Sequence, residues 1–361
     1  MDVLVVGGTG FVGEALSREL DDRGHDVTAL SRDPSDASLP GSVRRVSGDV
    51  SDYDSIEGAF DGQDAVVNLV ALSTLFRPIG GEERHFTVHR DGTAHVIRAA
   101  EAYGVPRLVQ MSGLGADPEG PTAYIRAKGQ AEALVRSSDL EWVIFQPSVI
   151  FGDGDEFTGA VKRLALPYIT PLPSGGSTPF QPIWIEDFTP MLAEAAEGAD
   201  GRGEATEGSD GRGEATARGE ARPGGRDGDR DEYDGEERDD DRDDDREDHP
   251  NDKRGRLHVG QTYQIGGPEV LTLADVARLA HAADGRPVRI VPVPMPLAWV
   301  GLRILEFVPA SVLDAIPLVP RMGTDQYRSL QFDSTTADND VVAFGVDPAD
   351  LKRYASYLGV E

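Results

Sequence analysis

Two side chains with complementary acid–base chemistry stand four residues apart in the segment Tyr124-Ile125-Arg126-Ala127-Lys128. On a helix, this spacing places both side chains on one face. A phenol with a pKa of about 10 transfers protons poorly at neutral pH unless a nearby cation lowers that pKa. The ammonium of Lys128 would supply the cation and could also hold a ribose hydroxyl. The pair predicts proton transfer at an oxygen atom, although the same spacing also occurs on helices that do no chemistry.

A glycine-rich turn at the start of the chain offers a site for a diphosphate group. The sequence is Val3-Leu4-Val5-Val6-Gly7-Gly8-Thr9-Gly10-Phe11-Val12-Gly13, an apolar run that leads into glycines spaced three apart. Gly7 permits a tight strand-to-helix turn, Gly10 lets the backbone approach the phosphates, and Gly13 lets helix and strand pack closely. The N–H groups and the positive dipole end of the following helix would face the anion. The alternative is a glycine turn without a ligand. The expected contacts of a dinucleotide are Gly7, Thr9, Gly10, Phe11, Val12 and Gly13.

The residues at the end of the second expected strand indicate whether NAD(H) or NADP(H) binds. An acidic residue at this tip would bond both ribose hydroxyls of NAD, but Ser31 and Arg32 occupy the region. A guanidinium beside the ribose pairs with a 2′-phosphate instead. We therefore expect NADP(H), while Asp33 keeps NAD(H) as the alternative and Arg32 could instead be a solvated surface residue.

Later strand ends add further expected contacts with the same ligand. Asp49 and Val50 follow the third strand, where a carboxylate can lie beside the adenine amine. Asn68, Val70 and Ala71 follow the fourth strand, where the backbone would flank the coenzyme. Each contact is weak evidence alone, and their order after the glycine turn gives them weight.

The elements that must position these residues alternate along the first part of the chain. Strand patterns cover 2–6, 26–30, 43–47, 64–70, 107–111 and 141–146, and helical patterns cover 11–23, 53–60, 84–103 and 121–137. Alternating buried strands and helices are typical of a parallel sheet with helices on both faces. We predict an α/β fold with a doubly wound, Rossmann-type parallel sheet.

Three regions follow from the composition along the chain. Residues 1–150 form the predicted dinucleotide-binding domain, with its core continuing to about 196. Residues 197–258 contain a repeated Gly-rich decamer and a run of aspartate and arginine, so we predict a disordered acidic insertion that lacks the apolar residues to form a core. A strand at 261–265, a helix at 272–283 and a strand at 288–292 then predict a small C-terminal substrate lobe over 259–361, together with parts of 151–196.

Charge and residue usage exclude several classes of protein. The net charge is −29, and lysine occurs only at positions 128, 162, 253 and 352, a pattern that resembles proteins of salt-loving organisms. Without a basic stripe, nucleic-acid binding is not expected.

The chain has no cysteine, which excludes disulfides, thiolate nucleophiles and zinc–thiolate sites, and we expect no metal site. No apolar run reaches the ~18 residues of a membrane span, and the chain opens directly into a strand, so we expect a cytoplasmic protein.

Together these residues resemble the extended or atypical short-chain dehydrogenase/reductase superfamily, which includes epimerases and dehydratases. The resemblance implies that Tyr124 and Lys128 are catalytic, that Ser112 orients the substrate oxygen, and that Pro147 contacts the nicotinamide end. The segment Gly266-Gly267-Pro268-Glu269-Val270-Leu271-Thr272 is similar to the subfamily that includes the nucleotide-binding accessory subunit of respiratory complex I and its prokaryotic relatives. Two positions depart from the superfamily pattern, because Gln146 stands where arginine is usual and His89 where asparagine is usual.

Several functions remain open on these residues. The first is an oxidoreductase or epimerase acting on a carbonyl or hydroxyl group, with Val288 to Pro320 as a wall for a lipophilic substrate or as the core of the small lobe. The second is a non-catalytic NADP(H)-binding accessory or assembly subunit, associated with a membrane respiratory complex at the inner face of the cell membrane. The third is a redox-sensing regulator. His89 would either relay protons or pack within its helix.

Overall fold

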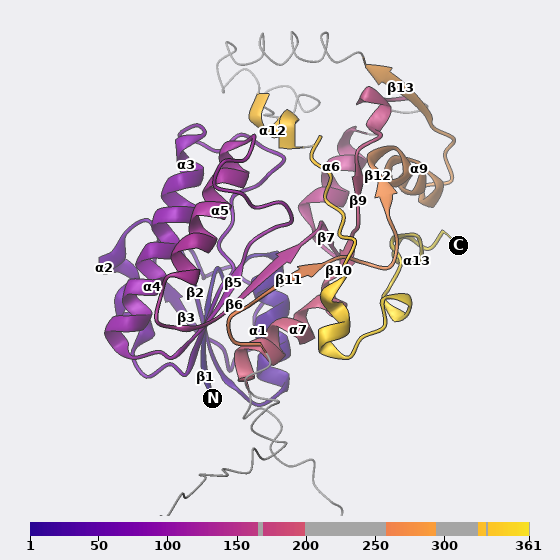
Figure 1. The fold of residues 1–361 in the computed structure, drawn as a ribbon. Coiled ribbons are helices and arrows are strands. Elements are labelled where there is room, and N and C mark those ends of the chain that lie inside the picture. Colours follow the sequence, from indigo (N-terminus) through magenta and orange to yellow (C-terminus); the bar gives the residue numbers. More distant parts are fainter. Residues whose placement is uncertain (165–168, 199–257, 294–323, 330, 361) are drawn as a thin grey trace, which may run out of the picture. The chain divides into compact units, whose positions relative to one another are not determined.

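The computed structural model describes residues 1–164, 169–198, 258–293, 324–329 and 331–360. Its centre is a seven-stranded sheet in the order β11-β6-β5-β4-β1-β2-β3 (Figure 1). Every neighbouring pair in this sheet is parallel. The strands are β1 (Asp2–Val6), β2 (Asp26–Ser31), β3 (Arg44–Ser47), β4 (Ala65–Asn68), β5 (Arg107–Met111), β6 (Glu141–Pro147) and β11 (Gln261–Ile265).

Helices cover both faces of this sheet, as a doubly wound fold requires (Figure 1). On one face, α1 (Phe11–Asp22) packs beside α7 (Ile185–Glu197), and Leu16 and Phe188 join one apolar core. On the other face, α4 (Gly92–Tyr103) and α5 (Ala123–Arg136) bury Val96 and Val135 in a second core. The central strands read as apolar runs because both of their faces are buried. The predicted fold class is confirmed.

The helix expected over 84–103 consists of three pieces. These are α3 (Glu83–His85), a single π-helical turn η2 (Phe86–Asp91), and α4. A π-turn carries an extra residue per turn and occurs most often at functional sites. Here it packs against α5, the helix that carries Tyr124. The helix expected over 53–60 is likewise divided, into α2 (Tyr53–Ile56) and the 3-10 turn η1 (Glu57–Phe60).

A smaller lobe has its own apolar core, which includes Phe151, Phe180, Trp184 and Tyr354. Its helices in the described ranges are α6 (Glu156–Leu164), α9 (Leu273–Ala283), α12 (Thr324–Ser329) and α13 (Tyr354–Leu358). Its short strands are β7 (Ile150–Phe151), β8 (Ile169–Pro173), β9 (Pro179–Phe180), β10 (Ile183–Trp184), β12 (Leu271–Thr272) and β13 (Arg289–Val293). They pair as β7 with β10, β8 with β13 and β9 with β12.

One boundary differs from the sequence prediction. Gln261–Ile265, expected to open the C-terminal lobe, is β11 and pairs with β6 at the edge of the large sheet. Its alternate side chains Tyr263 and Ile265 join the core between the sheet, α1 and α7. The predicted dinucleotide-binding domain is therefore completed by residues on the far side of the predicted insertion.

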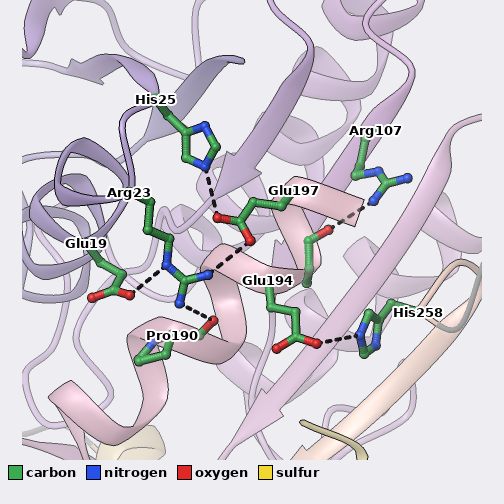
Figure 2. Close-up of polar contacts among 9 residues, drawn as sticks. Glu19, Arg23, His25, Arg107, Pro190, Glu194, Glu197 and His258 are labelled. Carbon is green, nitrogen blue, oxygen red and sulfur yellow. Dashed lines mark hydrogen bonds and ion pairs between the residues drawn. The ribbon is translucent and has the colours of Figure 1, made fainter. Parts of the chain in front are cut away.

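The two ends of the predicted insertion 197–258 are packed against the large sheet. The Glu197 carboxylate, at the end of α7, accepts hydrogen bonds from Arg23 at 3.0 Å and from His25 at 2.9 Å (Figure 2). His258 stacks on the Phe344 ring at 4.8 Å and shares a 2.8 Å hydrogen bond with the Tyr263 hydroxyl. These terminal residues are thus part of the folded unit, whereas the prediction of disorder for 199–257 lies outside the described residues. The apolar segment that starts at Val288 also lies outside them from 294 onward.

Candidate functional site

The glycine turn has the backbone geometry that the sequence predicts. Gly7 has a φ of 88°, a region that other residues rarely adopt. A Cβ on Gly13 would overlap the carbonyl oxygen of Gly7, so glycine is required where α1 passes over the turn. A Cβ on Gly10 would meet only that oxygen, at 3.4 Å, so the face of Gly10 is otherwise open. The turn therefore leaves backbone exposed at the start of α1, where a diphosphate can approach.

A cavity of about 620 Å³ extends from this turn along the carboxyl ends of β1, β2 and β4. Most of the coenzyme contacts expected from the sequence line it. Those residues are Gly7, Thr9, Gly10, Phe11, Val12, Gly13, Ser31, Arg32, Asp49, Val50, Val70 and Ala71.

Asn68 was expected to contact the coenzyme, but its side chain is buried within the protein. It is buried, and its side-chain amide donates to Gln110 at 2.9 Å and to Thr93 at 3.3 Å. Its side-chain oxygen accepts from the Val70 N–H at 3.4 Å, which shapes the loop after β4. Asn68 therefore supports the cavity wall and is absent from the cavity's described lining.

Two arginines, Arg32 and Arg84, line this cavity together with the carboxylate of Asp49. Arg84, which the sequence reading did not single out, lies 3.7 Å from Asp49, and Arg32 also acts on Asp49 electrostatically. Burial works to raise the pKa of Asp49, but hydrogen bonds from Ser51 and the charges of Arg84 and Arg32 outweigh it and lower the pKa. Arg32, Arg84 and Ser31 are all among the residues that line this cavity. The end of the cavity where these arginines lie suits an anionic group.

Ser31 supplies a test of whether this cavity fits a nucleotide. Its hydroxyl oxygen is buried and has no hydrogen-bond partner within the protein. An unpaired buried hydroxyl is unfavourable by about 1–3 kcal/mol, so such groups call for an explanation. A ribose hydroxyl or a phosphate oxygen bound at this end would supply the missing partner. The open glycine turn and the unpaired Ser31 both fit a dinucleotide.

A second cavity, of about 510 Å³, adjoins the first. The two share the lining residues Phe11, Val12, Leu69, Ala71 and Leu72. Ser112, Tyr124 and Pro147 line the second cavity. Three of the four residues expected at the reacting end therefore line one cavity beside the coenzyme cavity, whereas Lys128 is absent from the described lining of both cavities; the roles of all four remain predictions.

Ser112 and Tyr124 reach this cavity from neighbouring elements. Ser112 directly follows β5, its N–H donates to the Phe145 carbonyl at 2.7 Å, and its hydroxyl oxygen is buried without a partner. Tyr124 lies in the first turn of α5, and its hydroxyl would stand 3.3 Å from a Cβ on Gly113. A substrate oxygen in this cavity could thus meet two hydroxyl groups.

Lys128 has a different electrostatic effect from the one expected. Its ammonium is buried and donates to the Met111 carbonyl at 2.9 Å. Burial lowers the pKa of Lys128 to about 8, against the opposing charge of Glu132. Burial also raises the pKa of Tyr124 to about 12, whereas the sequence reading expected Lys128 to depress it. In the protein without ligands, Tyr124 is therefore a firmly protonated phenol.

Two histidines that contact Tyr124 form a cluster which the sequence reading found only in part. The rings of His85 and His89 are stacked at 5.7 Å, and both meet the Tyr124 ring edge-on, at 5.8 Å and 5.4 Å. His89 Nε2 lies 3.4 Å from the Leu72 N–H, while His89 Nδ1 and both nitrogens of His85 are buried without partners. Burial lowers the pKa of both rings, and the charge of Lys128 adds to the effect. The cluster is neutral and packs against the tyrosine.

Gln146, one of the two departures from the superfamily pattern, also has a structural partner. Its side-chain amide donates to Glu132 at 2.8 Å, and Glu132 also pairs with Arg136 at 2.8 Å. Gln146 thus ties β6 to α5 behind the site. It is absent from the described lining of either cavity.

Comparison with known proteins agrees with this geometry. A family model of NAD(P)H-binding domains matches residues 7–165. A 3-diazoavenalumate denitrifying reductase from Streptomyces sp is 31% identical over 222 residues, which are 55% of this chain and 72% of the relative. The chain belongs to the NAD(P)-binding short-chain dehydrogenase/reductase superfamily.

Two further similarities extend over more of the chain. Subunit 9 of the NADH dehydrogenase [ubiquinone] 1 alpha subcomplex of Arabidopsis thaliana is 24% identical over 360 residues, 97% of this chain and 75% of the relative. The crystal structure of a Thermus thermophilus UDP-glucose 4-epimerase complex with NAD aligns with a TM-score of 0.56 and 18% identity, over 92% of this chain and 98% of that one. The epimerase shares the fold. The matching family model and the NAD-bound epimerase support a nicotinamide dinucleotide as the coenzyme of this chain.

Proposed function

We propose that this protein is an NADP(H)-dependent oxidoreductase that acts on a carbonyl or hydroxyl group. The observation that carries the proposal is the contact between two cavities, one cradled by the glycine turn and one lined by Ser112 and Tyr124. A coenzyme in the first cavity would present its reactive end to a substrate in the second. The Streptomyces relative is named as a reductase, which supports redox chemistry.

In a carbonyl reduction, each of these residues would have a distinct role. When bound, the nicotinamide coenzyme supplies a hydride to the carbonyl carbon. Tyr124 donates its hydroxyl proton to the carbonyl oxygen, so that the carbonyl becomes an alcohol, and solvent later returns a proton to the phenol. The Ser112 hydroxyl donates a hydrogen bond that holds the oxygen and stabilises its developing charge. Lys128, which was expected to hold the coenzyme ribose, donates to the Met111 carbonyl and is absent from the described lining of both cavities, so we assign it a positioning role at the end of β5.

The preference for NADP(H) over NAD(H) rests on the arginines. A 2′-phosphate between Arg32 and Arg84 would form charge-assisted hydrogen bonds, and the Ser31 hydroxyl would complete its binding. Asp49 neutralises part of this positive charge and would face the adenine.

The test is NADPH oxidation with a panel of ketones, aldehydes and quinones. Tyr124→Phe keeps the ring but removes the proton donor, so turnover should fall by about a hundredfold or more while NADPH binding is retained. Tyr103→Phe is the matched control, because Tyr103 is 39% exposed at the end of α4. If NADPH binds and neither the native protein nor the variants turn over any of these compounds, the oxidoreductase proposal fails.

A second candidate is a non-catalytic accessory subunit of a membrane respiratory complex. It is favoured by the Arabidopsis subunit, whose similarity spans 97% of this chain. Affinity purification from native membranes at high salt tests it: respiratory subunits that co-purify in fixed proportion would support this role. Among the helices that the structure describes, none has both the length and the apolar character of a membrane span.

The charge of the chain supports a proposed setting. A net charge of −29 with four lysines favours the cytoplasm of a salt-loving cell, where ions screen repulsion between carboxylates. Refolding yield and NADPH affinity should both improve as salt is raised from a low concentration to the molar range.

A further inference from the structure

We propose that the second cavity takes an uncharged carbonyl compound with an extended alkyl or aryl body, and that it excludes phosphate-bearing substrates such as nucleoside-diphosphate sugars. This inference rests on the proposed function, because it assigns the substrate class of the same site. It follows from how polar, apolar and charged side chains are distributed around the 510 Å³ cavity.

Hydroxyl groups that can bind a substrate oxygen lie at one end of the cavity. Ser112 has a buried hydroxyl oxygen with no partner in the protein, and the Tyr124 hydroxyl lies close to Gly113, the next residue. Ser112 follows β5, which pairs with β4, and the residues that follow β4 include Leu69 and Ala71, which line both cavities. The hydroxyl groups of Ser112 and Tyr124 could therefore both hydrogen-bond to one substrate oxygen, next to the coenzyme cavity.

Three further polar side chains in the lining, those of Ser148, Asp155 and Ser73, have hydrogen-bond partners within the protein. The Ser148 hydroxyl donates to the Ser334 carbonyl at 2.6 Å and accepts from the Gln181 N–H at 3.0 Å. The Asp155 carboxylate accepts from the Thr158 N–H at 2.6 Å, and the Ser73 hydroxyl accepts from the Leu75 N–H at 3.1 Å. A ligand with many hydroxyl groups would have to compete with these bonds.

Apolar side chains from both lobes form the rest of the wall. Phe157 and Phe180 of the small lobe meet edge-on at 5.1 Å, and both line the cavity. Leu75, Leu114 and Val149 line it from the loops after β4, β5 and β6. Apolar surface of this kind gains about 25 cal/mol for each Å² that a ligand removes from water. The substrate body that fits is therefore a hydrocarbon chain or ring.

The two cavities differ in whether they contain cationic side chains. The coenzyme cavity has Arg32 and Arg84 in its lining together with Asp33 and Asp49, whereas the charged residues in the described lining of the second cavity are the carboxylates Asp155 and Glu156. In the part of its lining that the structure describes, the second cavity has no lysine, arginine or histidine. Such cations commonly bind phosphate groups, and nearby carboxylates repel a phosphate. The second cavity thus favours a ligand without phosphate.

Calorimetric titration of the NADPH-loaded protein tests the proposal directly. The probes are undecanone, an uncharged ketone with a long alkyl body, and UDP-glucose. We expect undecanone to bind at least about tenfold more tightly than UDP-glucose. Tighter binding of UDP-glucose, or binding of neither probe, would overturn the inference.

A pair of Val→Arg variants locates the binding. Val149 is half-buried in the cavity wall, so Val149→Arg places a cation in apolar surroundings and should weaken undecanone binding by roughly tenfold or more. Val270→Arg is the matched control, because Val270 is 57% exposed and outside the described lining. NADPH affinity and the thermal unfolding midpoint of each variant show whether the fold is retained. Leu75→Arg provides a second cavity variant if Val149→Arg unfolds.

The results of these binding and turnover experiments distinguish the proposed substrate class from the proposed oxidoreductase activity. If turnover depends on Tyr124 but only UDP-sugars react, the oxidoreductase or epimerase chemistry stands and the substrate class is wrong. If undecanone binds in a Val149-dependent way but no carbonyl compound turns over, the cavity assignment stands and the proposed reaction fails. Equal effects of Val149→Arg and Val270→Arg on undecanone binding would contradict the site itself.

Discussion

The Lys128 ammonium donates a 2.9 Å hydrogen bond to the carbonyl oxygen of Met111, the last residue of β5. This contact fixes the lysine under the strand end that carries Ser112, and it leaves the side chain only 1% exposed. Glu132, one turn further along α5, is also buried and raises the pKa of Lys128, but burial dominates and lowers that pKa to about 8. Burial of the charged Lys128 ammonium therefore lowers the stability of the folded protein.

Lys128→Met should reveal this cost through its pH dependence. Because the folded-state pKa lies below the usual 10.5, the unfolded state binds more protons between about pH 8 and about pH 10.5, and native stability rises with pH in this window. The 2.5-unit difference corresponds to roughly 3 kcal/mol, since one pKa unit is about 1.4 kcal/mol. Urea unfolding at about pH 7 and about pH 10 should show the native protein gaining by roughly this amount relative to Lys128→Met. Parallel pH curves for the two proteins would show that the lysine is not buried as described.

Arg32→Ala and Arg84→Ala should each weaken NADPH binding more than NADH binding. Each substitution removes a charge-assisted hydrogen bond to a 2′-phosphate, worth about 1.5–3 kcal/mol, or roughly ten- to a hundredfold in affinity. Fluorescence titration with both coenzymes measures the change. Arg18→Ala is the control, because Arg18 pairs with Glu14 on the exposed side of α1. Equal losses for NADPH and NADH would refute the 2′-phosphate assignment.

The glycine turn and the order of the strands could be predicted because their signals are local. The predicted strands 2–6, 64–70 and 107–111 coincide with β1, β4 and β5 within two residues. The turn needs glycine at positions 7 and 13 because of contacts within a few residues. Such features depend on neighbouring residues in the sequence, so a single sequence is sufficient to infer them.

Features that depend on distant contacts could not be read in the same way. Arg84 reaches the cavity from a helix 52 positions after Arg32, and no local pattern marks it. His85 and His89 are four positions apart, a spacing that local helix geometry can place on one face, but their contacts with Tyr124 require α5 to pack against the π-turn. The pKa of Tyr124 depends on its burial in the folded protein, so spacing to Lys128 alone gave the wrong direction.

His89→Gln should make the protein less sensitive to acid. Burial lowers the pKa of His89 well below its usual value, and Lys128 and His85 lower it further. The unfolded state therefore binds an additional proton as the pH falls below about 6.5, and native stability falls by up to about 1.4 kcal/mol per pH unit for this one group. Glutamine cannot take that proton, so the stability of the variant should fall less steeply. Urea unfolding between about pH 7 and about pH 5 compares the slopes, and identical slopes would contradict the burial of His89.

Two deletions that differ by three residues should have different effects on stability. Replacing 199–257 by a flexible Gly/Ser linker keeps Glu197 and His258, and should leave coenzyme affinity unchanged and unfolding free energy within about 1 kcal/mol, because the removed segment is poor in apolar residues. Replacing 197–258 also removes the carboxylate that pairs with Arg23 and His25 (Figure 2). It removes the His258 ring that stacks on Phe344 as well. That deletion should cost roughly 2–4 kcal/mol, because it leaves buried polar partners unpaired.

Glu197→Gln in the full chain separates the anchoring contacts from the deletion. It keeps the shape of the side chain but removes the charge that Arg23 and His25 face, so it should reproduce part of the loss caused by the longer deletion. Glu186→Gln is the matched control, since Glu186 lies exposed in the first turn of the same helix. Chemical unfolding and NADPH titration measure all four proteins. If the shorter deletion unfolds the chain while Glu197→Gln is silent, then residues 199–257 contribute to the stability of the folded unit, and the anchoring role of Glu197 is wrong.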